Sequence, residues 1–265
     1  MFETPAPAKY RLCVVFIVAA FLLGFVVELA RAQPDSSTSA STSAADEGVA
    51  MSLAQMLRAA RTVISANQDL INDASKGDKG LTSAAVLAAA VKIYHETTGS
   101  DPSSIDPNSR TGRLLRAQMD SIVEVMDANQ QTINTKGVDF KAFIPATFAR
   151  LVNEAFARRA GDQASVKVTA PVDLVRNRKA LPDAWEQQII ETKFLAPGWK
   201  KGEPFEAMVK DDGQQKFRMM LPEYYAASCL SCHGSPKGSV DITGYPREGG
   251  KEGDLGAVIS VTLAH

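Results

Sequence analysis

The chain has 265 residues, which is enough for one or two domains with a sizeable core. Its formal net charge of -1 lacks the basic excess typical of nucleic-acid-binding proteins, so no nucleic-acid partner is expected. Hydrophobic residues make up 45% of the chain and charged residues 22%, a balance that indicates a soluble globular protein.

The first 32 residues have the three parts of a secretory signal peptide. Lys9 and Arg11 precede an apolar run over residues 13–27, and Ala30-Arg31-Ala32 then gives the A-x-A pattern of a cleavage site. The run is shorter than the about 20 apolar residues that span a membrane. We therefore predict export to the periplasm with cleavage after Ala32. The alternative is an uncleaved anchor, the only case in which we expect contact with a membrane.

The segment after the signal changes from a polar tract to a helical pattern. Residues 33–50 are rich in Ser, Thr and Ala without apolar periodicity, which predicts a disordered linker. From Met51 onward, apolar residues recur at three- and four-residue spacing, as in amphipathic helices. We expect a helical part over residues 51–160, with helices at about 51–71, 83–95, 113–134 and 143–158.

A short motif occurs twice in this helical part. The Ala-Asn-Gln-x-x-Ile-Asn sequence of residues 66–72 reappears at residues 128–134, each time near a predicted helix end. Two explanations stay open: a paired-helix arrangement, or coincidence between Asn/Gln-rich helix ends.

Residues 161–265 carry the signals of strands and turns. Alternation predicts strands at 165–169 and 256–263, and a hairpin of strands 205–209 and 215–220 surrounds Asp-Asp-Gly at 211–213. A short helix is expected at 185–190. The predicted fold class is therefore α+β, with N-terminal antiparallel helices followed by an antiparallel sheet.

The strongest chemical signal is Cys229-Leu230-Ser231-Cys232-His233, a C-x-x-C-H motif. Two thiols on one turn can reach the two vinyl groups of one porphyrin, and the next residue can ligate the iron as proximal histidine. We predict one covalently attached haem c. A Cys229–Cys232 disulfide or redox dithiol, and a zinc site, are the alternatives. Cys13 lies within the signal and would be lost on cleavage.

The other side of the iron has no clear ligand in the sequence. His95, Met219 and Met220 are candidate distal ligands, because His and Met are common axial ligands. The competing interpretations are a surface or capping role for His95 and core packing for the methionines. A five-coordinate iron is equally open. His265 is the last residue and is expected to be mobile.

A basic cluster at Arg176, Arg178 and Lys179 can pair with haem propionates through bidentate contacts. The alternative is a solvated surface patch, with Asp183 and Glu186 as ion-pair partners nearby.

Three stretches of the chain resemble the exported PAS-like c-type haem sensor domains, often catalogued as a domain of unknown function. These stretches are Arg-Asn, Pro-Asp and Trp-Glu within 176–186, Tyr-Tyr-Ala-Ala-Ser leading into the haem motif at 224–234, and Gly-Asp-Leu-Gly-Ala-Val-Ile-Ser-Val at 253–261. The resemblance implies that residues 51–265 form a haem-binding PAS-like domain whose antiparallel sheet carries the attachment turn. Some relatives use a helical-region cysteine as distal ligand, which the mature chain lacks. Relatives are often fused to kinase or receptor modules, whereas this chain stops at His265.

The expected function is an exported redox- or small-ligand-sensing haem module that acts through a redox or signalling protein partner. The alternative is a periplasmic electron-transfer cytochrome c. A peroxidase-like enzyme is the weakest of the three hypotheses, because no distal His–Arg pair is visible near the motif, and we expect no enzyme activity.

Overall fold

The computed structural model describes residues 36–211 and 213–265. The predicted signal peptide, residues 1–32, lies outside this part. The helical part consists of α1 (Ser36–Ala66), α2 (Gln68–Asn72), α3 (Ser83–Thr98), α4 (Arg110–Asn134) and α5 (Pro145–Ala160), with short 3-10 segments η1 (Pro102–Ser104) and η2 (Gly161–Gln163). No helix in the described ranges is long and apolar enough to cross a membrane.

The linker predicted at residues 33–50 is wrong from residue 36 onward, because α1 begins at Ser36. Tertiary contacts account for this. Val49 and Ala50 are buried in the core, and the buried Asp46 carboxylate pairs with Arg110 at 2.6 Å and with His265 at 3.2 Å. These partners lie far along the chain, so the local Ser/Thr/Ala composition does not reveal them. The contact with Asp46 also holds the terminal histidine that we expected to be mobile.

Local capping sets the ends of the other helices. Thr82 accepts a hydrogen bond from the backbone of Ala85 and begins α3, as predicted. Ser109 does the same for α4, which therefore starts three residues earlier than the apolar pattern indicated. Pro145 occupies the first turn of α5, where its missing N–H costs nothing.

The two copies of the repeated motif lie at the ends of α2 and α4, and each copy bonds to the loop that follows the other. The Asn72 side chain accepts a hydrogen bond from the backbone N–H of Lys141 at 3.2 Å, and Asn134 accepts one from Lys79 at 3.1 Å. In the same way, one motif's glutamine donates to the loop after the other motif: Gln68 to Phe143 O and Gln130 to Leu81 O. Each copy therefore satisfies backbone groups beside the other, which supports the paired arrangement over coincidence.

The described strands form one antiparallel sheet in the order β1-β4-β3-β2. Its strands are β1 (Ala164–Thr169), β2 (Phe205–Asp211), β3 (Gln214–Tyr224) and β4 (Leu255–Ala264). The predicted hairpin is confirmed, because β2 and β3 pair from Phe205–Met220 to Asp211–Gln214. The structure is thus α+β, as expected.

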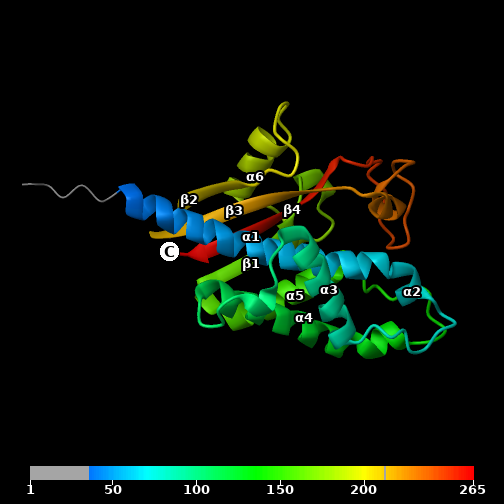
Figure 1. Cartoon of the computed structure of the whole chain (residues 1–265). Coiled ribbons are helices and arrows are strands. Elements are labelled where there is room, and N and C mark those ends of the chain that lie inside the picture. Colours follow the sequence, from blue (N-terminus) through cyan, green and yellow to red (C-terminus); the bar gives the residue numbers. More distant parts are fainter. Residues whose placement is uncertain (1–35, 212) are drawn as a thin grey trace, which may run out of the picture. The chain divides into compact units, whose positions relative to one another are not determined.

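Two apolar clusters pack against opposite faces of the sheet, and the long helices lie along one of these faces (Figure 1). On one face, Met219 packs in the large core that the sheet shares with α1, α3, α4 and α5. On the other face, Met220 packs against α6 (Ala184–Ile189) and the π-helical turn η5 (Ile190–Phe194). Neighbouring residues of a strand point to opposite faces, which explains the separation of the two methionines. The segment between β3 and β4 lies at one end of the sheet (Figure 1).

Candidate functional site

The C-x-x-C-H motif follows directly after β3. Cys229 ends the 3-10 turn η6 (Ala227–Cys229), and Cys232 and His233 belong to the one-turn helix α7 (Leu230–His233). Both cysteines are free and partly exposed, so the structure contains no Cys229–Cys232 disulfide. One short helical segment therefore presents two thiols and one imidazole together.

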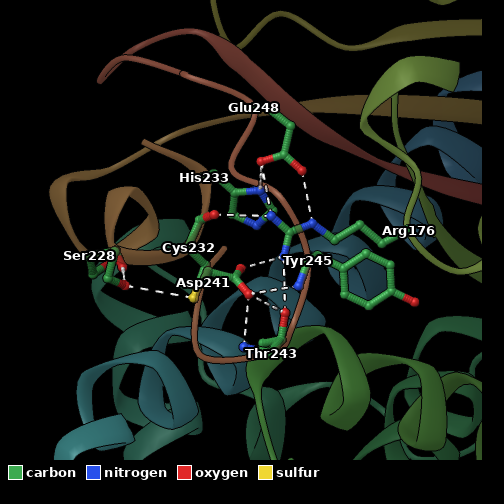
Figure 2. A network of polar contacts seen from close by, with 9 residues as sticks. Arg176, Ser228, Cys232, His233, Asp241, Thr243, Tyr245 and Glu248 are labelled. Carbon is green, nitrogen blue, oxygen red and sulfur yellow. Dashed lines mark hydrogen bonds and ion pairs between the residues drawn. The ribbon is translucent and has the colours of Figure 1, made fainter. Parts of the chain in front are cut away.

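Glu248 orients the His233 ring. Its Oε2 atom lies 2.8 Å from Nδ1 of His233 (Figure 2). An ionised carboxylate can only accept a hydrogen bond, so Nδ1 carries the proton. The other ring nitrogen, Nε2, has no hydrogen-bond partner within the described ranges, so its lone pair is free. A carboxylate on the non-ligating nitrogen is the usual arrangement for a metal-bound histidine.

The backbone of the turn after the motif has a different partner. The Ser235 carbonyl accepts a hydrogen bond from Arg247 at 3.2 Å, and the His233 proton is donated to Glu248.

Tyr225 fixes the plane of the same imidazole. Its ring is stacked on His233 with a centroid separation of 5.1 Å and an interplanar angle of 19°. A Cβ on Gly250 would come within 2.6 Å of the Tyr225 ring, so glycine is needed for this approach. Burial, followed by the nearby Glu248 charge, raises the pKa of Tyr225 to about 12. The stack and the carboxylate together leave the imidazole little rotational freedom.

Arg176 is the centre of the polar network, but not as predicted. Its Nε and Nη2 atoms donate to the two Glu248 oxygens at 2.8 and 3.0 Å, and Nη2 also donates to the Cys232 carbonyl at 3.0 Å. Its Nη1 atom donates to Asp241 at 2.6 Å and to Thr243 at 3.2 Å (Figure 2). These five contacts use all five guanidinium N–H groups. In this arrangement Arg176 has no donor left for the predicted propionate contact, which stays a prediction.

The Arg176 contacts tie the motif to the loop that returns to β4. Asp241 forms a tight turn in that loop, accepting from both the backbone and the hydroxyl of Thr243 at 2.8 and 2.6 Å. Burial opposes ionisation of Asp241, but the hydrogen bonds from Thr243 and Arg176 outweigh it and lower its pKa. Burial likewise opposes ionisation of Glu248, and the bonds from Arg176 and His233 again lower the pKa. Both groups are therefore carboxylates at neutral pH.

The last turns of α1 lie against the start of the motif. The Ser65 hydroxyl is 3.4 Å from the hydroxyl of Ser228, which directly precedes Cys229. One and two turns earlier, Arg61 and Arg58 both form ion pairs with Glu223 near the end of β3. The N-terminal helix thus supplies one side of the site.

The remaining predicted site residues lie elsewhere. His95 is exposed on the last turn of α3 and takes no part in the polar network drawn in Figure 2. Met219 and Met220 are fully buried in the two apolar clusters, which gives both a packing role. Arg178 is exposed on the 3-10 turn η4 (Arg178–Ala180). The structure therefore brings Arg176, Cys232 and His233 together. The four residues of this paragraph lie outside that group.

Sequence reasoning did not identify Glu248, Asp241 or Tyr225 as parts of the site. The Asp-x-Thr-Gly sequence at 241–244 signals a turn, since Asp and Thr side chains bond nearby backbone groups. No local pattern connects that turn to Arg176, which is 65 residues away.

The loop after the motif exposes apolar side chains. Val240, Ile242 and Tyr245 are exposed. Tyr245 also lines an open cleft together with Arg176 and Glu248 of the polar network and with Val175 and Lys237.

Of the three comparisons with known proteins, one gave a match, and it covers most of the chain. No match was found among curated proteins or among solved structures. The family model described as Tll0287-like matches residues 39–264, a range that includes most of α1, the helices that follow it, the sheet and the C-x-x-C-H motif. The chain therefore belongs to the Tll0287-like family.

Proposed function

We propose that this protein carries one haem c, attached through Cys229 and Cys232 with His233 as proximal ligand, and acts as an exported redox- or small-ligand-sensing module. The observation that carries the proposal is the carboxylate-oriented His233 ring beside two free thiols. The sheet, with helices on one face and α6 on the other, is compatible with the PAS-like part of the proposal.

The residues present fit a covalently bound porphyrin. Both thiols are partly exposed and free to form thioethers, and Nε2 of His233 is free to ligate iron. When bound, the haem supplies a one-electron redox change and, with an open sixth position, a site for a diatomic ligand.

The chain's own residues set the properties of such a site. Glu248 holds the Nδ1 proton of His233, which makes Nε2 a stronger donor and favours ferric iron. Arg176 fixes Glu248 and the Cys232 carbonyl at the same time, so the ligand and one attachment residue keep their relative positions.

The direct test is the pyridine haemochrome spectrum of the exported protein beside a Cys229→Ser/Cys232→Ser variant. We expect the spectrum of a haem with two thioether bonds in the native protein and none in the variant. Denatured native protein that releases all of its haem, or that has none, contradicts the proposal. The N-terminal sequence of the exported protein tests cleavage after Ala32.

The second candidate is a periplasmic electron carrier that passes electrons to a redox partner. The exposed Val240, Ile242 and Tyr245 beside the motif favour it, since such a patch suits brief contact with another protein. Ferrous CO-binding spectra distinguish the two. A sensor is expected to bind CO or exchange a ligand on reduction, whereas a carrier stays six-coordinate. An unchanged spectrum in His95→Ala removes His95 as distal ligand.

A further inference from the structure

We propose that Arg61 binds a haem propionate through the edge of its guanidinium formed by Nε and Nη2. This inference rests on the haem attachment proposed above. It concerns α1, which contributes no residue to the C-x-x-C-H motif.

Arg61 has one edge in use and one edge free. Its Nη1 atom forms the ion pair with Glu223. Its Nε atom is buried and has no hydrogen-bond partner within the described ranges. Nη2 likewise donates to no group there. A buried donor without a partner is costly, so a ligand that accepts from it is favoured. The Nε–Nη2 edge presents two parallel N–H groups, which match the two oxygens of a carboxylate.

The neighbouring arginine provides an internal comparison. Arg58 also pairs with Glu223, but it uses Nε for that bond, while Nη2 donates to the Pro222 carbonyl at 3.3 Å and Nη1 to Gln55 at 3.2 Å. Its Nε–Nη2 edge is therefore occupied by the protein. Two guanidinium groups share the single Glu223 carboxylate, so the cluster keeps one uncompensated positive charge, and the free edge lies on Arg61.

Two independent contacts locate Arg61 beside the motif. Ser65 is one helical turn further along α1, about 5.4 Å of rise, and its hydroxyl is 3.4 Å from Ser228, the neighbour of Cys229. Glu223, the ion-pair partner of Arg61, is two residues before Tyr225, whose ring stacks on His233. Arg61 is thus connected to the motif on two sides, through Ser65 on its own helix and through Glu223 on β3.

The chemistry of this edge selects the ligand. The Nε–Nη2 edge suits a second carboxylate, because Glu223 already accepts from Nη1 of Arg61. A haem c held by Cys229 and Cys232 carries two propionate carboxylates, and pairing one of them with the surplus charge of the cluster satisfies the buried Nε–H.

The test is redox-difference infrared spectroscopy of the holoprotein with ¹³C-labelled propionate carboxylates. Arg61→Gln and Arg58→Gln form a matched pair, because each removes one positive charge and one Glu223 ion pair. Arg61→Lys keeps the charge but lacks the two-pronged edge. We expect the labelled carboxylate band to shift in Arg61→Gln and Arg61→Lys and to stay at the wild-type position in Arg58→Gln.

The outcomes separate this inference from the haem proposal. A propionate band that stays in place in Arg61→Lys, or that shifts equally in Arg58→Gln, overturns the assignment to Arg61 while the covalent haem stands. Absence of covalent haem from the wild-type protein overturns both. If Arg61→Gln does not accumulate as folded protein, Arg61→Lys decides the outcome.

Discussion

Nδ1 of His233 lies 2.8 Å from Oε2 of Glu248, a residue on the loop that leads back to the sheet. Both oxygens of Glu248 also accept from Arg176, so the carboxylate is held from two sides. The orientation of the imidazole is therefore set by a residue outside the motif. This relationship makes the properties of the proposed haem depend on Glu248 as well as on the motif.

The first prediction concerns replacement of Glu248 by Gln, which is expected to raise the reduction potential of the haem. The amide oxygen of Gln accepts the Nδ1–H hydrogen bond more weakly than a carboxylate does. The His233 ring then donates less electron density to the iron through Nε2, so the ferric state is less stabilised. We expect a change of roughly tenfold in the reduction equilibrium, about 59 mV for one electron, measured by spectroelectrochemical titration.

The control for that titration is Glu252→Gln, which removes the same charge from an exposed position on the same loop. An equal shift in both variants would mean that charge alone, and not the contact with His233, sets the potential.

Replacement of Arg176 by Ala is expected to destabilise the fold strongly. The change leaves the Asp241 side chain, which is fully buried, and the Glu248 carboxylate without their cation. Loss of one partner of a buried ion pair costs about 3–5 kcal/mol. Urea unfolding measures this cost. Arg178→Ala, on an exposed turn two residues away, is the control and is expected to change the stability by less than about 0.5 kcal/mol. Similar losses in the two variants would refute the central role of Arg176.

The third prediction is that acid weakens the fold through Asp241. Its pKa is lower in the folded protein than in the unfolded chain, so its stabilising contribution is complete above about pH 4 and is lost as the pH falls further. Asp241→Asn removes the titrating group. This variant is expected to be less stable at pH 7, but to lose less unfolding free energy between pH 4 and pH 2. Urea midpoints across this range test it, with the exposed Asp139→Asn as control; equal acid slopes in the wild type and Asp241→Asn contradict the assignment.

Features that depend on neighbouring residues could be predicted from the sequence. The hairpin follows from Asp-Asp-Gly at 211–213, and the helix predicted from about residue 83 is α3, which begins at Ser83. The two cysteines and His233 were identified because their spacing within one turn is itself the signal.

Features that depend on distant partners could not be predicted in this way. The N-terminal half of α1 is held through Asp46 by contacts with Arg110 and His265, which local composition does not reveal, so a linker was expected where the structure has a helix. Arg176 was identified as a basic residue of the site, but its partners lie 56–72 residues further along the chain. Composition could suggest an anionic partner for it, and only the folded chain shows that this partner is the protein itself.

The last prediction uses the reciprocal pair of helix ends. Asn72→Ala leaves the backbone N–H of Lys141 unpaired, and Asn134→Ala leaves that of Lys79 unpaired. Both lysines are largely buried, so each change is expected to cost about 1–3 kcal/mol in urea unfolding. The two costs should be similar, because the two asparagines make equivalent contacts.

The matched control for this pair is Asn129→Ala. The Asn129 side chain donates only to Val125 O within its own helix, so its loss is expected to change the stability by about 0.5 kcal/mol or less. If the three variants are equally stable, the reciprocal contacts do not stabilise the fold. If only one of Asn72→Ala and Asn134→Ala is destabilised, the two copies are similar in sequence but do not contribute equally to the stability of the fold. Equal losses at Asn72 and Asn134 would show that both copies of the motif stabilise the helical layer that packs against the sheet.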